Sequence, residues 1–284
     1  MYSFPIGVIT ESFRLPVREA IRAAAALGAD GIQMYAVAGE TSAEALTKEK
    51  RRELLDFVHS NGLRFSALCG DLGMGFGSRE RNPELIERSK RILELAKDLE
   101  TDVVTTHIGV VPSDPNHPRY GVMQEACFSL AQYADQLNAH FAVETGPEPA
   151  AVLKGFLDGL FSTGISVNLD PANLVMVAGD DPVRAVHTLR RYIVHTHAKD
   201  GVMLCKGDPE VIYRVTPPPT AAAPQEYFRE LPLGQGNVDF PAYLRALEEI
   251  GYKGFLTIER EAGSDPAADI RTAKDYLQSI IAAN

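Results

Sequence analysis

The sequence lacks the features that mark a secreted, membrane-spanning or zinc-thiolate protein. Only three cysteines (Cys69, Cys127 and Cys205) occur in 284 residues, far apart and without C-x-x-C spacing. That usage is typical of reduced thiols in the cytoplasm rather than of a disulfide framework. The first residues contain no basic segment followed by an apolar core, so we expect no secretion signal. No uninterrupted apolar run approaches the roughly 20 residues needed to cross a bilayer. We therefore expect a cytoplasmic protein with no membrane contact.

Positive charge is also scarce. The formal net charge is −10 and the pI is near 5.2, which argues against a nucleic-acid partner because phosphate backbones are bound by clustered Lys and Arg. The net charge does not exclude a small polar or anionic substrate, since a local basic pocket can exist in an acidic protein. Hydrophobic residues make up 45% and charged residues 23% of the chain, which is typical of a globular protein with a sizeable core.

Short strand-like runs alternate with amphipathic helical segments along almost the whole chain. The pattern predicts strands at 6–10, 31–35, 64–69, 102–107, 140–144, 165–170, 192–197 and 254–259, and helices at 16–27, 42–60, 83–99, 121–138, 150–160, 182–189, 240–250 and 266–283. Eight strand–helix units predict a (β/α)8 TIM barrel, an α/β fold formed by residues 1–284 as a single domain. A doubly wound sheet would need a glycine-rich turn after the first strand, and residues 10–13 (Thr-Glu-Ser-Phe) form no such turn.

One long segment, at about residues 202–236, reads as irregular and contains three consecutive prolines and three consecutive alanines. Loops of that length inside a compact domain are usually functional or disordered. The segment follows the seventh strand, on the face where barrel active sites form, so a substrate lid is the favoured hypothesis. A tolerated insertion is the alternative, because surface loops lengthen at little cost in free energy.

Ligand-type side chains end four successive predicted strands: Glu144, Asp170, His197 and Glu259. Strand ends of a barrel converge on one rim, so these side chains should surround a single point. His195 shares a strand face with His197. Three carboxylates placed together repel one another, and a divalent cation is the natural compensation. Three oxygen ligands and one nitrogen suit one Mn²⁺, Mg²⁺ or Co²⁺ ion, with Zn²⁺ less apt because no thiolate takes part.

Five runs carry a family resemblance: VETGPE at 143–148, NLDPANL at 168–174, HTHAKDG at 195–201, LGQGNVDF at 233–240 and TIERE at 257–261. They resemble the sugar phosphate isomerase/epimerase family, which is the xylose-isomerase-like TIM-barrel superfamily. The resemblance implies that Glu144, Asp170, His197 and Glu259 bind the metal and that the two glutamates also act as acid and base. It implies an isomerase of carbohydrate metabolism that removes a proton next to a carbonyl through a metal-stabilised enediolate. Its substrate would be a sugar or sugar phosphate, and a homo-oligomer would be in keeping with proteins of this kind.

Further residues are expected near the substrate, namely His107, Glu148, Asn173 and Lys199. Asn173 stands where the epimerases resembled have a histidine, and Met203 where they have an arginine, so substrate contacts should differ from those of free-ketose epimerases. Glu261 shares the predicted strand face of Glu259 and is the alternative ligand. Asn168 shares the face of Asp170 and could support the metal site. The glycine-rich loop at 70–77 could hold a phosphate with its amides or be a flexible connection.

The sequence is compatible with three other functions. A metal-dependent polyol dehydratase of the inosose type would begin with the same proton abstraction. A DNA-repair enzyme like endonuclease IV shares the superfamily, but it needs several metals, additional histidines and a basic groove, whereas the third strand here ends in Cys69. A sugar-binding barrel without turnover is the remaining alternative.

Overall fold

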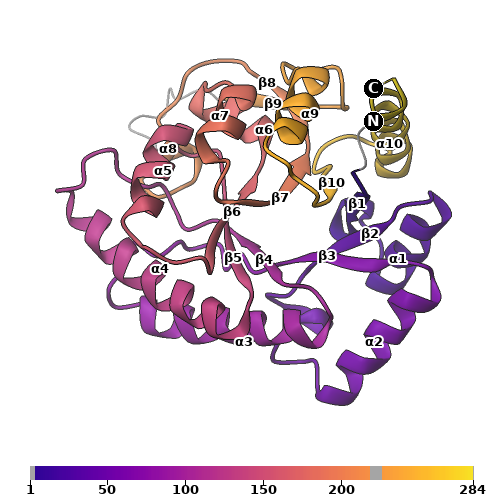
Figure 1. Cartoon of the computed structure of the whole chain (residues 1–284), viewed down its shortest axis with the longest axis horizontal. Helices are drawn as coiled ribbons and strands as arrows, with labels where there is room; N and C mark the ends of the chain where they lie inside the picture. Colours follow the sequence, from indigo (N-terminus) through magenta and orange to yellow (C-terminus); the bar gives the residue numbers. More distant parts are fainter. Residues whose placement is uncertain (1–3, 218–225, 284) are drawn as a thin grey trace.

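The computed structural model describes residues 4–217 and 226–283. Within those residues, eight parallel strands close into a barrel in the order β1-β10-β7-β6-β5-β4-β3-β2, and helices surround it (Figure 1). The barrel strands are β1 (Ile6–Ile9), β2 (Gly31–Tyr35), β3 (Arg64–Cys69), β4 (Val103–Thr106), β5 (His140–Glu144), β6 (Ile165–Leu169), β7 (Ile193–Ala198) and β10 (Leu256–Ile258). The predicted TIM barrel is therefore confirmed.

Helices follow the barrel strands. They are α1 (Val17–Ala26), α2 (Lys48–Ser60), α3 (Asn82–Asp98), α4 (Pro118–Leu137), α5 (Ala150–Asp158), α6 (Pro171–Asn173), α7 (Pro182–Leu189), α8 (Pro209–Ile212), α9 (Phe240–Glu249) and α10 (Pro266–Ala282), with shorter turns η1 (Thr10–Phe13), η2 (Gly39–Thr41) and η3 (Leu174–Ala178). All of the described helices except α8 contain buried residues. A continuous apolar core lies between strands and helices and includes Ile32, Leu93, Phe141 and Leu244. None of the described helices is long and apolar enough to span a bilayer.

Several predicted boundaries were wrong by a few residues. The second helix begins at Lys48 rather than at 42, because Thr47 caps it by accepting from the Lys50 amide at 3.3 Å. The fourth helix begins at Pro118, since His117 caps its first turn. The eighth barrel strand covers only Leu256–Ile258, so Glu259 lies just past its end. All three cysteines, which lie in the described part of the chain, are free as predicted.

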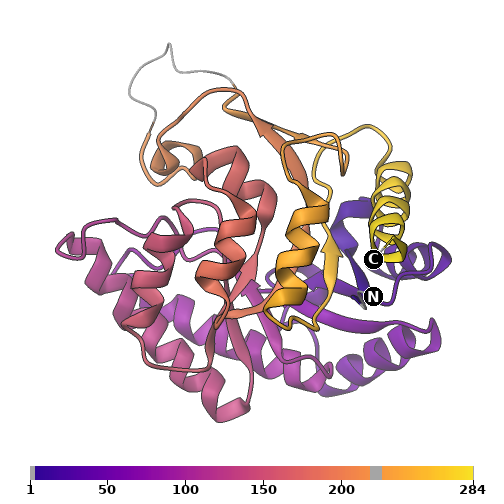
Figure 2. The ribbon, with the colours of Figure 1, turned by 45° about the horizontal axis from the view of Figure 1, so that its top comes forward.

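The segment predicted as one irregular loop contains regular structure. Strands β8 (Asp200–Met203) and β9 (Phe228–Leu231) form an antiparallel ribbon, and α8 lies between them. Figure 2 shows the ribbon, in orange, extending from the end of β7 beyond the barrel. The prediction of an irregular segment was therefore wrong for these residues. Most of its proline and alanine run, at 218–225, lies outside the described residues.

Asp200 holds the ribbon in place. Its carboxylate accepts hydrogen bonds from the backbone amides of Gly201, Gly234, Gly236 and Val238 at 2.8–3.1 Å. Gly236 is needed for this close approach, because a Cβ there would lie 2.1 Å from Asp200 Oδ1. One buried carboxylate thereby links the start of the ribbon to the segment that leads back to α9, and β10 pairs with β7 across the insertion.

Candidate metal centre

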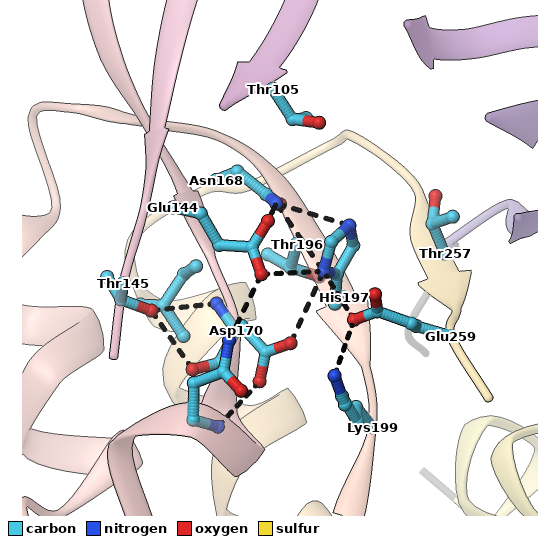
Figure 3. Close-up of polar contacts among 12 residues, drawn as sticks. Thr105, Glu144, Thr145, Asn168, Asp170, Thr196, His197, Lys199, Thr257 and Glu259 are labelled. Carbon is cyan, nitrogen blue, oxygen red and sulfur yellow. Dashed lines mark hydrogen bonds and ion pairs between the residues drawn. The ribbon is translucent and has the colours of Figure 1, made fainter. Parts of the chain in front are cut away.

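Four ligand-type side chains meet at the carboxyl ends of four neighbouring strands. Glu144 is the last residue of β5, Asp170 follows β6, His197 lies near the end of β7 and Glu259 follows β10. Their ligand atoms all lie within 4.8 Å of one another and all four residues are buried. Figure 3 shows the side chains converging, with Glu144 and Glu259 on either side of His197. The structure brings together the four residues that the sequence selects.

His197 lies at the centre of this cluster. Its Nδ1 is 3.6 Å from Glu144 Oε1, 3.3 Å from Asp170 Oδ2 and 3.1 Å from Glu259 Oε2. Its other ring nitrogen, Nε2, lies 3.2 Å from Gln33 Oε1 and can donate to it, which directs Nδ1 at the carboxylates. Burial alone would lower the pKa of His197, but Glu144 and Glu259 raise it well above its usual range. The cluster therefore favours positive charge at its centre.

The carboxylates differ in their surroundings. Burial raises the pKa of Asp170 to about 6, although its hydrogen bond to His197 opposes the shift. Burial would also raise the pKa of Glu259, but Lys199 and His197 lower it well below its usual value. Burial would likewise raise the pKa of Glu144, but His107 and His197 lower it. Three buried oxygen ligands and one imidazole nitrogen, close enough to share one ion, fit a divalent cation.

Asp170 and Asn173 are held by the turn that follows β6. Asp170 Oδ1 caps α6 by accepting from the Asn173 amide at 2.8 Å, which leaves Oδ2 facing His197. The Asn173 side chain then donates to Glu144 Oε1 at 3.1 Å. This packing requires Gly146, whose φ is +140° and whose added Cβ would lie 2.3 Å from Asn173 Cβ. Asn173, which was predicted to contact substrate, thus orients a candidate ligand.

The structure places two other predicted substrate residues at the cluster. His107 follows β4, and its Nε2 lies 3.5 Å from Glu144 Oε1. Lys199 is buried, with its Nζ 3.2 Å from Glu259 Oε2 and 2.6 Å from Glu261 Oε2. Both side chains can therefore influence the charge of the two glutamates that were predicted to act as acid and base.

Glu148 and Glu261 lie outside the four-residue cluster. Glu148 is buried and accepts from the Val111 amide at 3.1 Å, and burial raises its pKa to about 8. The Glu261 side chain is 63% exposed and pairs with Lys199. The structure does not bring this alternative ligand to the cluster, because the chain leaves the barrel after the short strand β10.

A hydrogen-bonded chain inside the barrel supports the cluster, and sequence reasoning recognised only part of it. Asn168 donates to Glu144 Oε2 at 3.2 Å, and its Oδ1 lies 2.9 Å from His195 Nδ1. His195 Nε2 lies 2.9 Å from Thr257 Oγ1, which contacts Ser66 Oγ at 3.3 Å. Burial, and the nearby charge of His197, lower the pKa of His195 well below its usual range, so its imidazole is neutral. A neutral His195 can donate to Asn168 and accept from Thr257.

Tyr213 was not predicted as a site residue. It follows α8, and its ring packs 5.4 Å from the His107 ring, centroid to centroid. Burial, together with Glu144 and Asp170, raises its pKa well above the usual value, so the phenol is neutral. Nothing in its local sequence marks it, because only the return of the insertion over the barrel brings it to β4 and β5.

A closed barrel with a buried three-carboxylate, one-histidine cluster at the carboxyl ends of its strands defines a TIM barrel whose cluster could hold a metal ion. Residues 21–280 match the family described as Xylose isomerase-like TIM barrel. The chain belongs to that family, as its sequence motifs predict.

Known proteins similar to this chain include enzymes named for sugars. One, from Escherichia coli strain K12, is named "Putative L-ribulose-5-phosphate 3-epimerase SgbU"; it is 24% identical over 241 residues, covering 81% of this chain and 78% of that protein. The crystal structure of a xylose isomerase domain protein from Planctomyces limnophilus has a TM-score of 0.79 at 25% identity, covering 98% of this chain and 96% of that one. A D-tagatose 3-epimerase-like protein has a TM-score of 0.75 at 18% identity, covering 98% and 99%, which supports the fold alone.

Proposed function

We propose that this protein is a divalent-metal-dependent isomerase or epimerase of a sugar or sugar phosphate. The observation that carries the proposal is the set of four buried ligand atoms within 4.8 Å of one another at the rim of the barrel. The relationship to an epimerase of a sugar phosphate supports the substrate class. Glu144, Asp170, His197 and Glu259 would hold one Mn²⁺, Mg²⁺ or Co²⁺ ion, and the ion would stabilise negative charge that develops on a substrate oxygen.

The two glutamates carry the proton transfers in this proposal. Glu144 is the last residue of β5 and Glu259 follows β10, and these are the outermost of the four strands that bear the cluster. The two glutamates can therefore approach a substrate carbon from opposite sides. One carboxylate removes the proton next to the carbonyl, and the other returns a proton to the opposite face, which inverts the centre. Return of the proton to the neighbouring carbon would interconvert an aldose and a ketose.

Glu144 and Glu259 have different neighbouring side chains. Lys199 contacts Glu259 and lowers its pKa, which keeps Glu259 ionised as a base. Glu144 faces His107 and Asn173, which hold its Oε1 in place. The insertion that carries Tyr213 would act as a lid that excludes water, since Tyr213 already packs on His107. We also propose a cytoplasmic location, because the cysteines are free and reduced thiols are typical of that compartment.

Metal content and affinity test the centre. We expect about one divalent ion per chain in the wild type, and binding that is lost or greatly weakened in Glu144→Gln, Asp170→Asn, His197→Ala and Glu259→Gln. Glu261→Gln is the matched control, because it removes an exposed carboxylate two residues from Glu259 and should leave metal binding nearly unchanged. Binding that is indifferent to all four ligand changes would refute the centre.

Turnover is tested by solvent deuterium exchange. The metal-loaded protein is incubated in D₂O with ketopentoses, ketohexoses and their phosphates, and NMR records deuterium at carbon and the configuration of the products. Inversion at one centre identifies an epimerase, an aldose product an isomerase, and loss of water the dehydratase alternative. Metal binding without exchange into any sugar would favour a binding protein instead.

A further inference from the structure

A cavity of about 420 Å³ opens beside the cluster and is assigned no role by the proposed chemistry. Its walls come from the glycine-rich loop after β3, the loop after β4, the first turn of α4 and the residues that follow α8. The charged and aromatic side chains that line it are Asp71, Arg81, His107, Arg119, Tyr213 and Arg214. We call this space the arginine cavity.

His107 connects the arginine cavity to the candidate metal centre. The same imidazole lines the cavity and places its Nε2 3.5 Å from Glu144 Oε1. Tyr213 packs on that ring and lines the cavity as well. The cavity and the candidate metal centre therefore share the His107 side chain.

The charge of the arginine cavity is opposite to that of the whole protein. Three guanidinium groups face it in a chain of net charge −10. Arg119 pairs with Glu210, but its Nε is buried without a hydrogen-bond partner in the described part of the chain. Within residues 4–217 and 226–283, the structure gives the side chains of Arg81 and Arg214 no ion pair and no hydrogen bond. Asp71, the carboxylate that also lines the cavity, accepts from the Gly73 amide at 2.8 Å.

Two helix N-termini add to this positive potential. Arg81 directly precedes α3, and Arg119 lies in the first turn of α4, so the partial positive charge of both helix dipoles adds to the guanidinium groups. The amides of the glycine-rich loop contribute less than its sequence suggests. The Gly73 amide is used by Asp71, and the Phe76 amide donates to Ile108 O at 2.9 Å.

We propose that the arginine cavity binds an oxyanion at the end of the substrate remote from the reacting carbon, through Arg81, Arg119 and Arg214. Guanidinium groups recognise phosphate and carboxylate by the same charge-assisted hydrogen bonds. The oxyanion is therefore a phosphate ester or a carboxylate of an open-chain sugar. This inference rests on the proposed function for the identity of the reacting end, and on the cavity alone for the anion.

The test titrates the full-length protein with inorganic phosphate and, separately, with acetate, at low ionic strength so that screening stays weak. Calorimetry gives the dissociation constants for the wild type, the double variant Arg81→Gln/Arg214→Gln and the control Arg271→Gln. Arg271 lies exposed on α10, away from the cavity. Each titration is run with and without Mn²⁺, because an anion bound by a metal ion would need the ion.

We expect phosphate to bind the wild type with or without Mn²⁺. Its dissociation constant should be about tenfold or more higher in the double variant and within twofold of the wild-type value in Arg271→Gln. Acetate binding with the same arginine dependence, in place of phosphate, would assign the cavity to carboxylates. Absence of binding by both anions, or equal binding by the wild type and the double variant, would overturn the proposal. These titrations need no turnover, so failure of the sugar exchange assay and failure of the anion site are separate results.

Discussion

Replacing Asn168 by leucine removes the amide that links the candidate metal centre to the barrel interior. Leucine has a similar size and branching, so the change removes polar contacts with little change of volume. Asn168 is fully buried, donates to Glu144 Oε2 and contacts His195 Nδ1. The variant leaves the His195 ring nitrogen without a partner and frees one oxygen of Glu144.

The expected magnitudes follow from these contacts. A buried polar group left without a hydrogen bond costs about 1–3 kcal/mol, and two such groups predict a loss of about 2–4 kcal/mol in the free energy of unfolding, since Glu144 keeps its contacts to Asn173 and His107. Removal of a group that orients a metal ligand weakens metal affinity by about 10- to 100-fold. Both effects should appear in the same variant.

The assay separates the two effects. Urea denaturation of the metal-free protein gives the stability loss, and competition with a chelator gives the Mn²⁺ affinity of the folded protein. Ser66→Ala is the matched control, because Ser66 contacts Thr257 at the other end of the same hydrogen-bonded chain. It should lower stability by about 1 kcal/mol and leave Mn²⁺ affinity within twofold of wild type. If Asn168→Leu folds and binds Mn²⁺ as tightly as the wild type, Asn168 does not position the centre.

Three other predictions test the buried acids and the ion. Burial raises the pKa of Glu148 from 4.5 in an exposed chain to about 8, so the folded state retains the proton and this residue's contribution to stability falls as the pH rises from about 4.5 to about 8. Glu148→Gln should abolish that pH dependence, and urea denaturation at pH 5 and pH 8 should show the wild type losing a few kcal/mol relative to the variant; equal changes in the two proteins would contradict it. Asp200→Ala leaves the amides of Gly201, Gly234, Gly236 and Val238 without their acceptor, and we expect a loss of about 3–5 kcal/mol in the free energy of unfolding, partly restored in Asp200→Asn. Asp239 caps α9 by accepting from the Ala242 amide at 3.0 Å, and Asp239→Ala should cost about 1 kcal/mol. A loss in Asp200→Ala no larger than that would be inconsistent with the role of Asp200 in the ribbon. Finally, Mn²⁺ at 100 times its dissociation constant should stabilise the wild type by about 2.7 kcal/mol and raise its Tm, with chelation reversing the shift and Asp170→Asn showing none.

The sequence by itself determined the order of the eight barrel strands and the positions of the four candidate metal ligands. Strand side chains alternate between faces, and the carboxyl ends of barrel strands meet on one rim, so a residue's place at a strand end is enough to locate it. Glu144, Asp170, His197 and Glu259 each lie within one residue of the end of a barrel strand. For that reason the cluster could be predicted without any knowledge of contacts.

Only the tertiary structure decided which side chains support those four residues. Gln33 and Thr257 reach His197 and His195 from strands far away in the chain, and periodicity gives the face of a residue but not its partner. The segment predicted as irregular contains a ribbon held by the hydrogen bonds of Asp200, and the insertion brings Tyr213 against His107. Arg81, Arg119 and Arg214 come from three separate connections and share a cavity only because the closed barrel brings those connections together.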